Sequence, residues 1–86
     1  MDETVKSSLE TLHGQLGDDQ VTDDAQKLHL AEVRQAVRDT IDNPTQHQHL
    51  TLRERLEKAS AVFDAEHPKI ATALHTAIIV LADAGF

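Results

Sequence analysis

Histidine is the residue type whose number and spacing most suggest chemistry, since six of the 86 residues are histidine and none is cysteine. His47 and His49 are two residues apart in a polar segment, and imidazole nitrogens are common zinc ligands. A third ligand could come from His13, His29 or an aspartate. Zinc sites need three or four converging ligands, so His47 and His49 are only weak metal candidates. We therefore expect no metal and no other cofactor.

His67 is the histidine with the most informative neighbours, because Asp64, Glu66 and Pro68 surround it in the sequence. A neighbouring carboxylate could orient the imidazole for proton transfer. Alternatively, His67 lies at a sharp corner between two helices, with Phe63 packed beneath it. The corner interpretation is favoured because it also explains the proline, which suits the first turn of a helix.

The remaining polar residues do not form a recognisable catalytic pattern. His29 and His75 flank apolar helical stripes and are expected to face solvent. No serine has an obvious base, and there is no phosphate-binding glycine loop. The aspartates that could suggest calcium are Asp18, Asp19, Asp23 and Asp24. They lack the alternating ligands, the central glycine and the final glutamate of an EF-hand loop. We expect that the protein is not an enzyme.

The charge distribution argues against a nucleic-acid partner. The net charge is −7, and residues 1–24 contribute −6 of it, with seven acids and one lysine. Such a chain repels phosphate backbones. Phe63 and Phe86 are its only aromatic residues, which leaves little for base stacking.

The length and the apolar segments indicate a small soluble domain. A chain of this size buries only about 60% of the surface that it exposes when unfolded. The opening MDETVKSSLE does not resemble a signal peptide. The most apolar segment, Ile70 to Phe86, has 17 residues and contains Asp83, whereas a membrane-spanning helix needs about 20 apolar residues. We expect a cytoplasmic protein with no membrane partner.

Helical periodicity runs through the whole chain, and no segment alternates with a period of two. The predicted fold is therefore all-α, a small bundle of about four helices arranged as antiparallel hairpins. The predicted helices span residues 2–16, 22–42, 51–66 and 68–84, in one domain covering residues 1–86.

Capping residues set the predicted helix boundaries. Gly17 is expected to end the first helix, and Thr22 to cap the second. Asn43-Pro44 should end the second helix, which leaves residues 43–50 as a loop. Thr51 with Glu54 then resembles a capping box for the third helix, and Gly85 should close the fourth.

Each of the first three helices carries a narrow apolar seam. These seams are Val5, Leu9, Leu12 and Leu16; then Leu30, Val33, Val37 and Ile41; then Leu52, Leu56, Ala59 and Phe63. Leu28 points away from its seam, which suggests a second packing partner for that helix. Lys27, Arg34 and Arg38 flank the same seam and are expected to pair with acids of a neighbouring helix.

The fourth helix has a broader apolar face and must be covered by its own chain or by another copy. Because the other seams are narrow and small domains often gain stability by oligomerising, we expect a homo-oligomer, most simply a homodimer. Phe86 should pack at the subunit contact or over the helix end. The residues assigned to the interface or to structural roles are Phe63, His67, Pro68, Ile70, Leu74, Ile78, Leu81 and Phe86.

Several segments resemble a family of short bacterial proteins, the domain-of-unknown-function 4404 family. These segments are Leu9-x-x-Leu12-His13 with Leu16, Leu52-x-x-Arg55-Leu56, Phe63-Asp64-Ala65-Glu66-His67-Pro68 and Leu81-Ala82-Asp83-Ala84-Gly85-Phe86. The family usually has Met before the terminal glycine and an aliphatic residue after it, where this chain has Ala84 and Phe86. The resemblance implies a helical protein and supplies no activity, cofactor or catalytic residue.

Three functional hypotheses follow. The first is a non-catalytic interaction or assembly protein whose partner is itself or another protein. The second is an acidic inhibitor or charge mimic that occupies a basic site on another protein, supported by residues 1–24. The third is metal or pH sensing through the histidines, which titrate near 6.5 when free.

Overall fold

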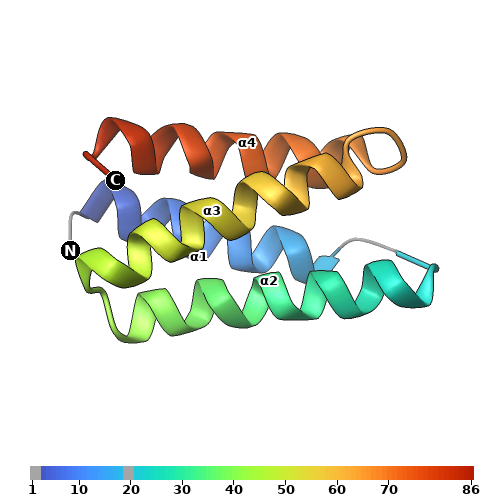
Figure 1. The fold of residues 1–86 in the computed structure, drawn as a ribbon, viewed down its shortest axis with the longest axis horizontal. Coiled ribbons are helices and arrows are strands. Elements are labelled where there is room, and N and C mark those ends of the chain that lie inside the picture. Colours follow the sequence, from blue (N-terminus) through green and yellow to red (C-terminus); the bar gives the residue numbers. More distant parts are fainter. Residues whose placement is uncertain (1–2, 19–20) are drawn as a thin grey trace.

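The chain folds into a bundle of four helices joined by short connections (Figure 1). The computed structural model describes residues 3–18 and 21–86. The helices are α1 (Glu3–Asp18), α2 (Asp24–Asp42), α3 (Gln46–Phe63) and α4 (Pro68–Asp83). No strand occurs within these described residues, which confirms the all-α prediction with four helices.

Successive helices run in opposite directions, and the bundle closes into a ring. Backbone contacts join α1 to α2, α2 to α3, α3 to α4, and α4 back to α1. Figure 1 shows that α1 and α4 therefore lie side by side, although they are at opposite ends of the sequence. This last pairing matters because it creates a surface built from the two ends of the chain.

The core is formed by the predicted seams. Val5, Leu9, Leu12 and Leu16 of α1 are each buried, as positions three and four residues apart share one face of a helix. The other helices contribute a further set of buried side chains, namely Leu30, Val33, Val37, Leu52, Leu56, Ala59, Phe63, Ile70, Leu74, Ala77 and Leu81. The part of the apolar face of α4 formed by Ile70, Leu74, Ala77 and Leu81 is thus covered by its own chain, whereas Ile79 is 60% exposed.

The predicted start of the first helix, residue 2, lies outside the described residues, and α2 and α3 begin at residues other than those predicted from the sequence. Asp23, not Thr22, caps α2, since the Asp23 carboxylate accepts a hydrogen bond from the Gln26 N–H at 2.9 Å. Helix α3 begins at Gln46, five residues earlier than predicted. The Thr45 hydroxyl accepts a bond from the Gln48 N–H at 3.1 Å, so Thr45 with Gln48 takes the place of the predicted Thr51 box.

The prediction of a loop over residues 43–50 is therefore wrong for its second half. Once Thr45 caps the helix, His49 lies three residues before Leu52 and joins the buried seam of α3. Residues 46–48 are polar, so the sequence shows no apolar periodicity that would indicate a helix over this turn.

The other helix ends also differ slightly from the prediction. Helix α1 continues past Gly17 to Asp18, and α3 ends at Phe63, with residues 64–66 forming a turn. At the end of α4, Gly85 has a φ of +94°. The Phe86 N–H donates to the Leu81 carbonyl and the Gly85 N–H to the Ala82 carbonyl, which together form a Schellman motif.

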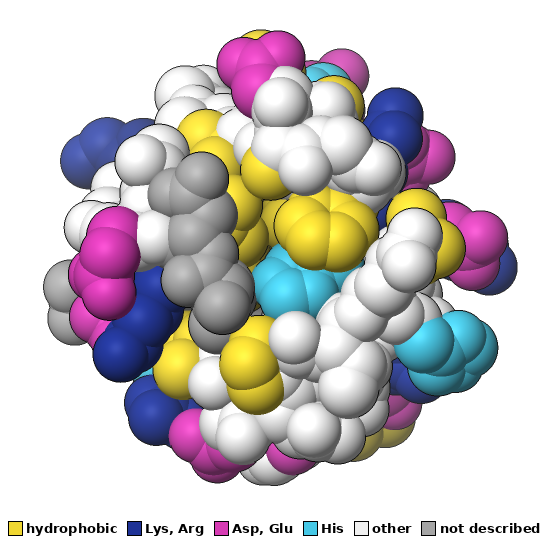
Figure 2. Space-filling model, turned by 90° about the vertical axis from the view of Figure 1, so that its left-hand side faces the viewer, with side chains coloured by type: hydrophobic (Ala, Val, Ile, Leu, Met, Phe, Trp, Pro, Cys, Tyr) yellow, Lys and Arg dark blue, Asp and Glu magenta, His cyan; other side chains and the backbone are white. Residues whose placement is uncertain are grey.

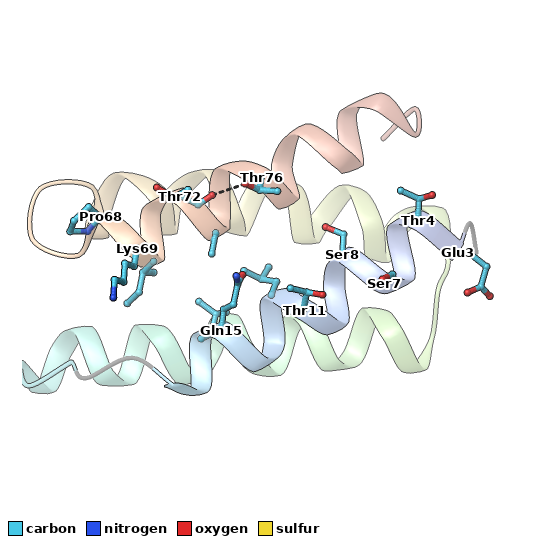
Figure 3. Close-up of a pocket in the computed structure, with 14 residues that line it drawn as sticks. Glu3, Thr4, Ser7, Ser8, Thr11, Gln15, Pro68, Lys69, Thr72 and Thr76 are labelled. Atoms are coloured by element: carbon cyan, nitrogen blue, oxygen red, sulfur yellow. Dashed lines mark hydrogen bonds between the residues drawn. The ribbon is translucent and has the colours of Figure 1, made fainter.

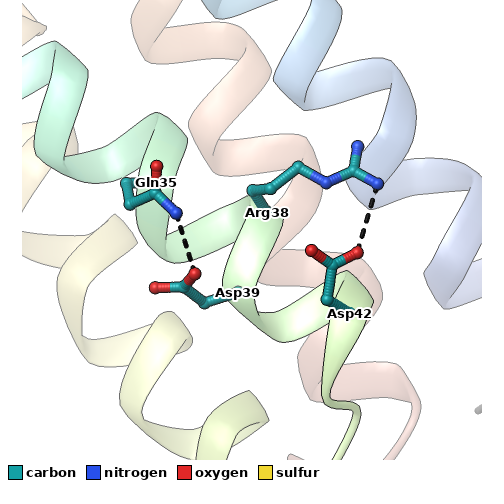
Figure 4. A network of polar contacts seen from close by, with 4 residues as sticks. All are labelled: Gln35, Arg38, Asp39 and Asp42. Atoms are coloured by element: carbon teal, nitrogen blue, oxygen red, sulfur yellow. Dashed lines mark hydrogen bonds and ion pairs between the residues drawn. The ribbon is translucent and has the colours of Figure 1, made fainter.

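Among the described residues, the basic residues beside the α2 seam form no ion pair with an acid of a neighbouring helix. Arg38 forms an ion pair with Asp42 of its own helix at 3.2 Å, close to a Gln35–Asp39 hydrogen bond of 2.8 Å (Figure 4). Arg34 instead lies over Gly17, where an added Cβ would approach its guanidinium to 3.0 Å. The arginine thus packs on the backbone of α1.

Candidate functional site

An open groove of about 1130 Å³ lies between α1 and α4. Its walls carry small hydroxyl side chains, and its base consists of core residues (Figure 3). The hydroxyl residues are Thr4, Ser7, Ser8 and Thr11 of α1 with Thr72 and Thr76 of α4. The apolar residues at the base are Leu12, Leu16, Ile70 and Ala73. The groove is therefore polar at its rim and apolar beneath.

The helical repeat explains why these residues gather. On α1 the buried seam faces the core, and Ser7 and Thr11 lie on the adjacent face, which turns toward α4. On α4 the same relation holds for Thr72 and Thr76, which are four residues apart and exposed. Small side chains on both helices leave the space open.

Opposite charges lie at the two ends of the groove. Glu3 lies at the first turn of α1, and Lys69 lies at the first turn of α4 beside Pro68. Because the two helices are antiparallel, these residues are at opposite ends of the groove (Figure 3). Neither forms an ion pair with any residue in the described part of the chain.

The polar groups of the groove are spread along its two walls. The Thr76 hydroxyl donates to the Thr72 carbonyl of its own helix at 3.0 Å. Among the described residues that line the groove there is no histidine, and the one carboxylate (Glu3) and the one lysine (Lys69) lie at opposite ends of it. General acid–base catalysis requires such groups to converge.

The weak metal candidates His47 and His49 lie on α3 and do not converge. Side chains two residues apart point to different sides of a helix; His47 is exposed and His49 is buried. The Nδ1 of His49 is 2.6 Å from the Thr45 carbonyl oxygen, which accepts its hydrogen bond. Nowhere within residues 3–18 and 21–86 do three His, Cys, Asp or Glu side chains gather to hold a metal.

The ring of His49 instead stacks on Phe86. Their centroids are 4.3 Å apart and the planes differ by 11°. Arg53 donates from Nη1 to the main-chain oxygen of Phe86 at 2.5 Å. Figure 2 views this end of the bundle, with a histidine side chain near its centre and hydrophobic side chains around it. Phe86 thus packs against the first two turns of α3.

His67 lies at the corner between α3 and α4, with Phe63 against it. The two rings meet edge to face with centroids 5.9 Å apart. The Nε2 of His67 is 3.2 Å from the Gln26 side-chain oxygen, and the Gln26 amide donates to Glu66. The hydrogen-bond partner of His67 is thus the side-chain amide of Gln26 on α2. The nearby carboxylate is that of Glu66, and it contacts the same amide.

The expectation of solvent-facing side chains is wrong for His29. Its ring lies 5.9 Å from that of Phe63, and its Nε2 is buried without a partner among the described residues. His75 is exposed, but its Nε2 lies 2.9 Å from the Ser60 hydroxyl. This Ser–His pair was not recognised in the sequence, because the two residues are 15 positions apart on different helices.

The Ser60–His75 pair joins two helices and lacks the other parts of a nucleophilic site. Ser60 is buried in the interior of α3, where the helix itself uses the backbone N–H groups that could stabilise an oxyanion. No carboxylate hydrogen bond to His75 occurs within the described residues. The pair is a hydrogen bond between α3 and α4.

His13 is the histidine whose charge the fold disfavours most clearly. Partial burial lowers the pKa of His13 below its usual 6.5, and the positive charges of Arg34 and Arg38 lower this pKa further. His13 is therefore neutral over a wider pH range in the folded protein than in the unfolded chain.

The remaining residues assigned structural roles divide between core and surface. Ile70, Leu74 and Leu81 are buried, Ile78 is half-buried, and Pro68 is exposed as the first residue of α4. None of the described helices is long and apolar enough to cross a membrane.

No curated protein and no solved structure matches the chain. A family model described as a domain of unknown function, DUF4404, matches residues 5–86, which confirms the resemblance found in the sequence. The matched region includes all of α2, α3 and α4 and most of α1. The chain therefore belongs to the DUF4404 family.

Proposed function

We propose that this chain is a non-catalytic assembly protein that forms a homodimer through the groove between α1 and α4. The groove carries the proposal: it is long, open and lined by small side chains, and its apolar base lies beneath a hydroxyl rim. Small residues at a helix surface allow another helix to approach closely. The apolar face of α4, from which a homo-oligomer was predicted, does not carry it, because Ile70, Leu74, Ala77 and Leu81 of that face are buried within the chain.

The size of this face sets the expected strength of the dimer. Helix α1 has 16 residues, which corresponds to about 24 Å at 1.5 Å per residue. With α4 alongside at about 10 Å, the two helices present a face on the order of 500 Å², or about 1,000 Å² across both copies. Stable interfaces bury about 1,200–2,000 Å² in total, so we expect a reversible dimer of micromolar affinity.

Sedimentation equilibrium at micromolar concentration tests this proposal. The wild-type protein should show a mass that rises with concentration from 9.5 kDa toward twice that value. Thr11→Arg places a long charged side chain in the groove and should keep the protein monomeric. Glu32→Arg, on an exposed position of α2 outside the groove, is the matched control and should behave like the wild type. A wild-type mass of 9.5 kDa at every concentration would contradict the proposal.

A second candidate function is an acidic charge mimic, which the exposure of several acids near the start of the chain favours. Glu3, Glu10, Asp23 and Asp24 are exposed, and residues 1–24 carry a net charge of −6. A partner held by such charges should dissociate as ionic strength rises. Capture from a bacterial lysate at low and moderate salt separates the two functions, because a dimer formed by apolar contact depends less on salt.

A further inference from the structure

We infer that the groove of one copy receives α1 of a second copy, which lies antiparallel to the first α1 and places Glu3 of each copy beside Lys69 of the other. This inference rests on the proposed dimer and specifies its arrangement. The observation behind it is the position of the two charges: Glu3 is at one end of the groove and Lys69 is at the other (Figure 3). A two-fold axis through the middle of the groove exchanges these ends.

Two-fold symmetry is the arrangement that uses both charges at once. In a closed dimer the same patch is used by both copies, so every contact occurs twice. Rotation about an axis perpendicular to α1 brings the acidic end of one groove onto the basic end of the other. Glu3 of each copy then meets Lys69 of its partner, and like charges stay apart.

The register of this contact follows from the residues that share each end. Gln15 and Lys69 both line the end of the groove opposite Glu3 (Figure 3). If Glu3 lies opposite Gln15 of the second copy, an antiparallel alignment places Ser7 opposite Thr11. Both of these side chains are small, exposed and part of the groove wall, so the two α1 helices can approach closely around the axis.

Without a second copy, the positive charge of Lys69 lies in an unfavourable position. Lys69 is the second residue of α4, where the positive end of the helix dipole disfavours a cation. It is exposed, and no acid in the described part of the chain pairs with it. A carboxylate from another molecule would pair with the Lys69 ammonium and would offset its unfavourable interaction with the helix dipole.

Charge exchange between copies provides the test. In the proposed dimer, Glu3→Lys and Lys69→Glu each place two like charges together at both ends of the interface. Because of this repulsion, the dimer of each variant alone should dissociate at a concentration about tenfold higher than the wild-type dimer. An equimolar mixture of the two variants should form a heterodimer with near wild-type affinity. In that heterodimer the two introduced side chains, of opposite charge, meet at one end, and the native Glu3 and Lys69 meet at the other. Glu32→Lys makes the same charge change on α2, outside the groove, and should leave the affinity unchanged.

Each outcome of this sedimentation experiment is decisive once far-ultraviolet circular dichroism shows that the variants are folded. Weakened single variants with a restored mixture support the arrangement. A wild-type dimer that both single variants leave intact, or a mixture that stays weak, overturns the arrangement but keeps the dimer. A monomeric wild type overturns the proposed function itself. If Thr11→Arg abolishes capture of another protein by this monomer, the groove binds that protein and not a second copy.

Discussion

His13, His49 and His67 lie in three different environments, although the sequence presents them as similar polar residues. His13 faces the arginines of α2, His49 is buried against Phe86, and His67 lies at the helix corner. The corner could be predicted because Pro68 and the neighbouring acids are local signals. The stack on Phe86 could not, because its partners are 37 residues apart and meet only after α3 and α4 have packed.

At this scale we predict that His13 makes stability depend on pH. Its pKa is lower in the folded protein than in the unfolded chain, so the unfolded state binds more protons as the pH falls below 6.5. The stabilising contribution is present above pH 6.5 and is lost as the pH falls through the folded pKa. The free energy of unfolding should therefore decrease on acidification, and His13→Gln should reduce that decrease.

Proton NMR titration checks the cause directly. The imidazole of His13 should titrate below 6.5, and Arg34→Gln should move its pKa upward by removing a positive charge. His47→Gln, at an exposed position of α3, is the control for loss of a histidine elsewhere. A His13 pKa above 6.5 in the wild-type protein would be inconsistent with this explanation.

We also predict that the stack between His49 and Phe86 stabilises the fold. Aromatic pairs contribute about 0.5–1.5 kcal/mol beyond the area that they bury, and Phe86 is itself half-buried. Phe86→Ala should lower the free energy of unfolding by about 1–2 kcal/mol. Phe86→Leu keeps apolar area without stacking and should lie between Phe86→Ala and the wild type in chemical denaturation. Equal stabilities for all three proteins would show that the stack contributes nothing.

At the scale of the elements, the existence of four helices could be predicted, and the start of α3 could not. Its apolar seam begins at Leu52, so the sequence pattern marks a helix only from there. The first turn consists of polar residues and is stabilised by Thr45, Gln48 and the buried His49. A rule that counts only apolar side chains does not detect a histidine that is buried by tertiary packing.

The position of the cap gives a prediction at this scale. Thr45→Ala removes the hydroxyl that accepts the Gln48 N–H and should destabilise the protein by about 1 kcal/mol. Thr51→Ala changes the residue that the sequence pattern suggested as the cap, which lies inside α3, and should cost less. Thermal unfolding of the two variants compares them, and a larger loss for Thr51→Ala would contradict the observed start of α3.

At the scale of the whole molecule, the groove exists because α4 packs beside α1, and no local sequence pattern reveals this packing. The hydroxyl residues of α1 and of α4 can each be seen in the sequence as an exposed polar face. Only the ring of contacts that brings α4 beside α1 joins these faces into one surface. The large exposed apolar residues Leu28, Leu50, Val62 and Ile79 do not line the groove. Leu28 is 64% exposed, so the second packing partner predicted for its helix is not found among the described residues.

The central claim is that the α1–α4 groove is the surface through which two copies associate. Amide NMR spectra recorded over a dilution series from millimolar to low micromolar concentration test it most directly, because they report both association and its location. Concentration-dependent shifts should be largest at Ser7, Thr11, Thr72 and Thr76 and absent from the outer faces of α2 and α3. Spectra that do not change on dilution, or changes centred on α2 and α3, would contradict the claim.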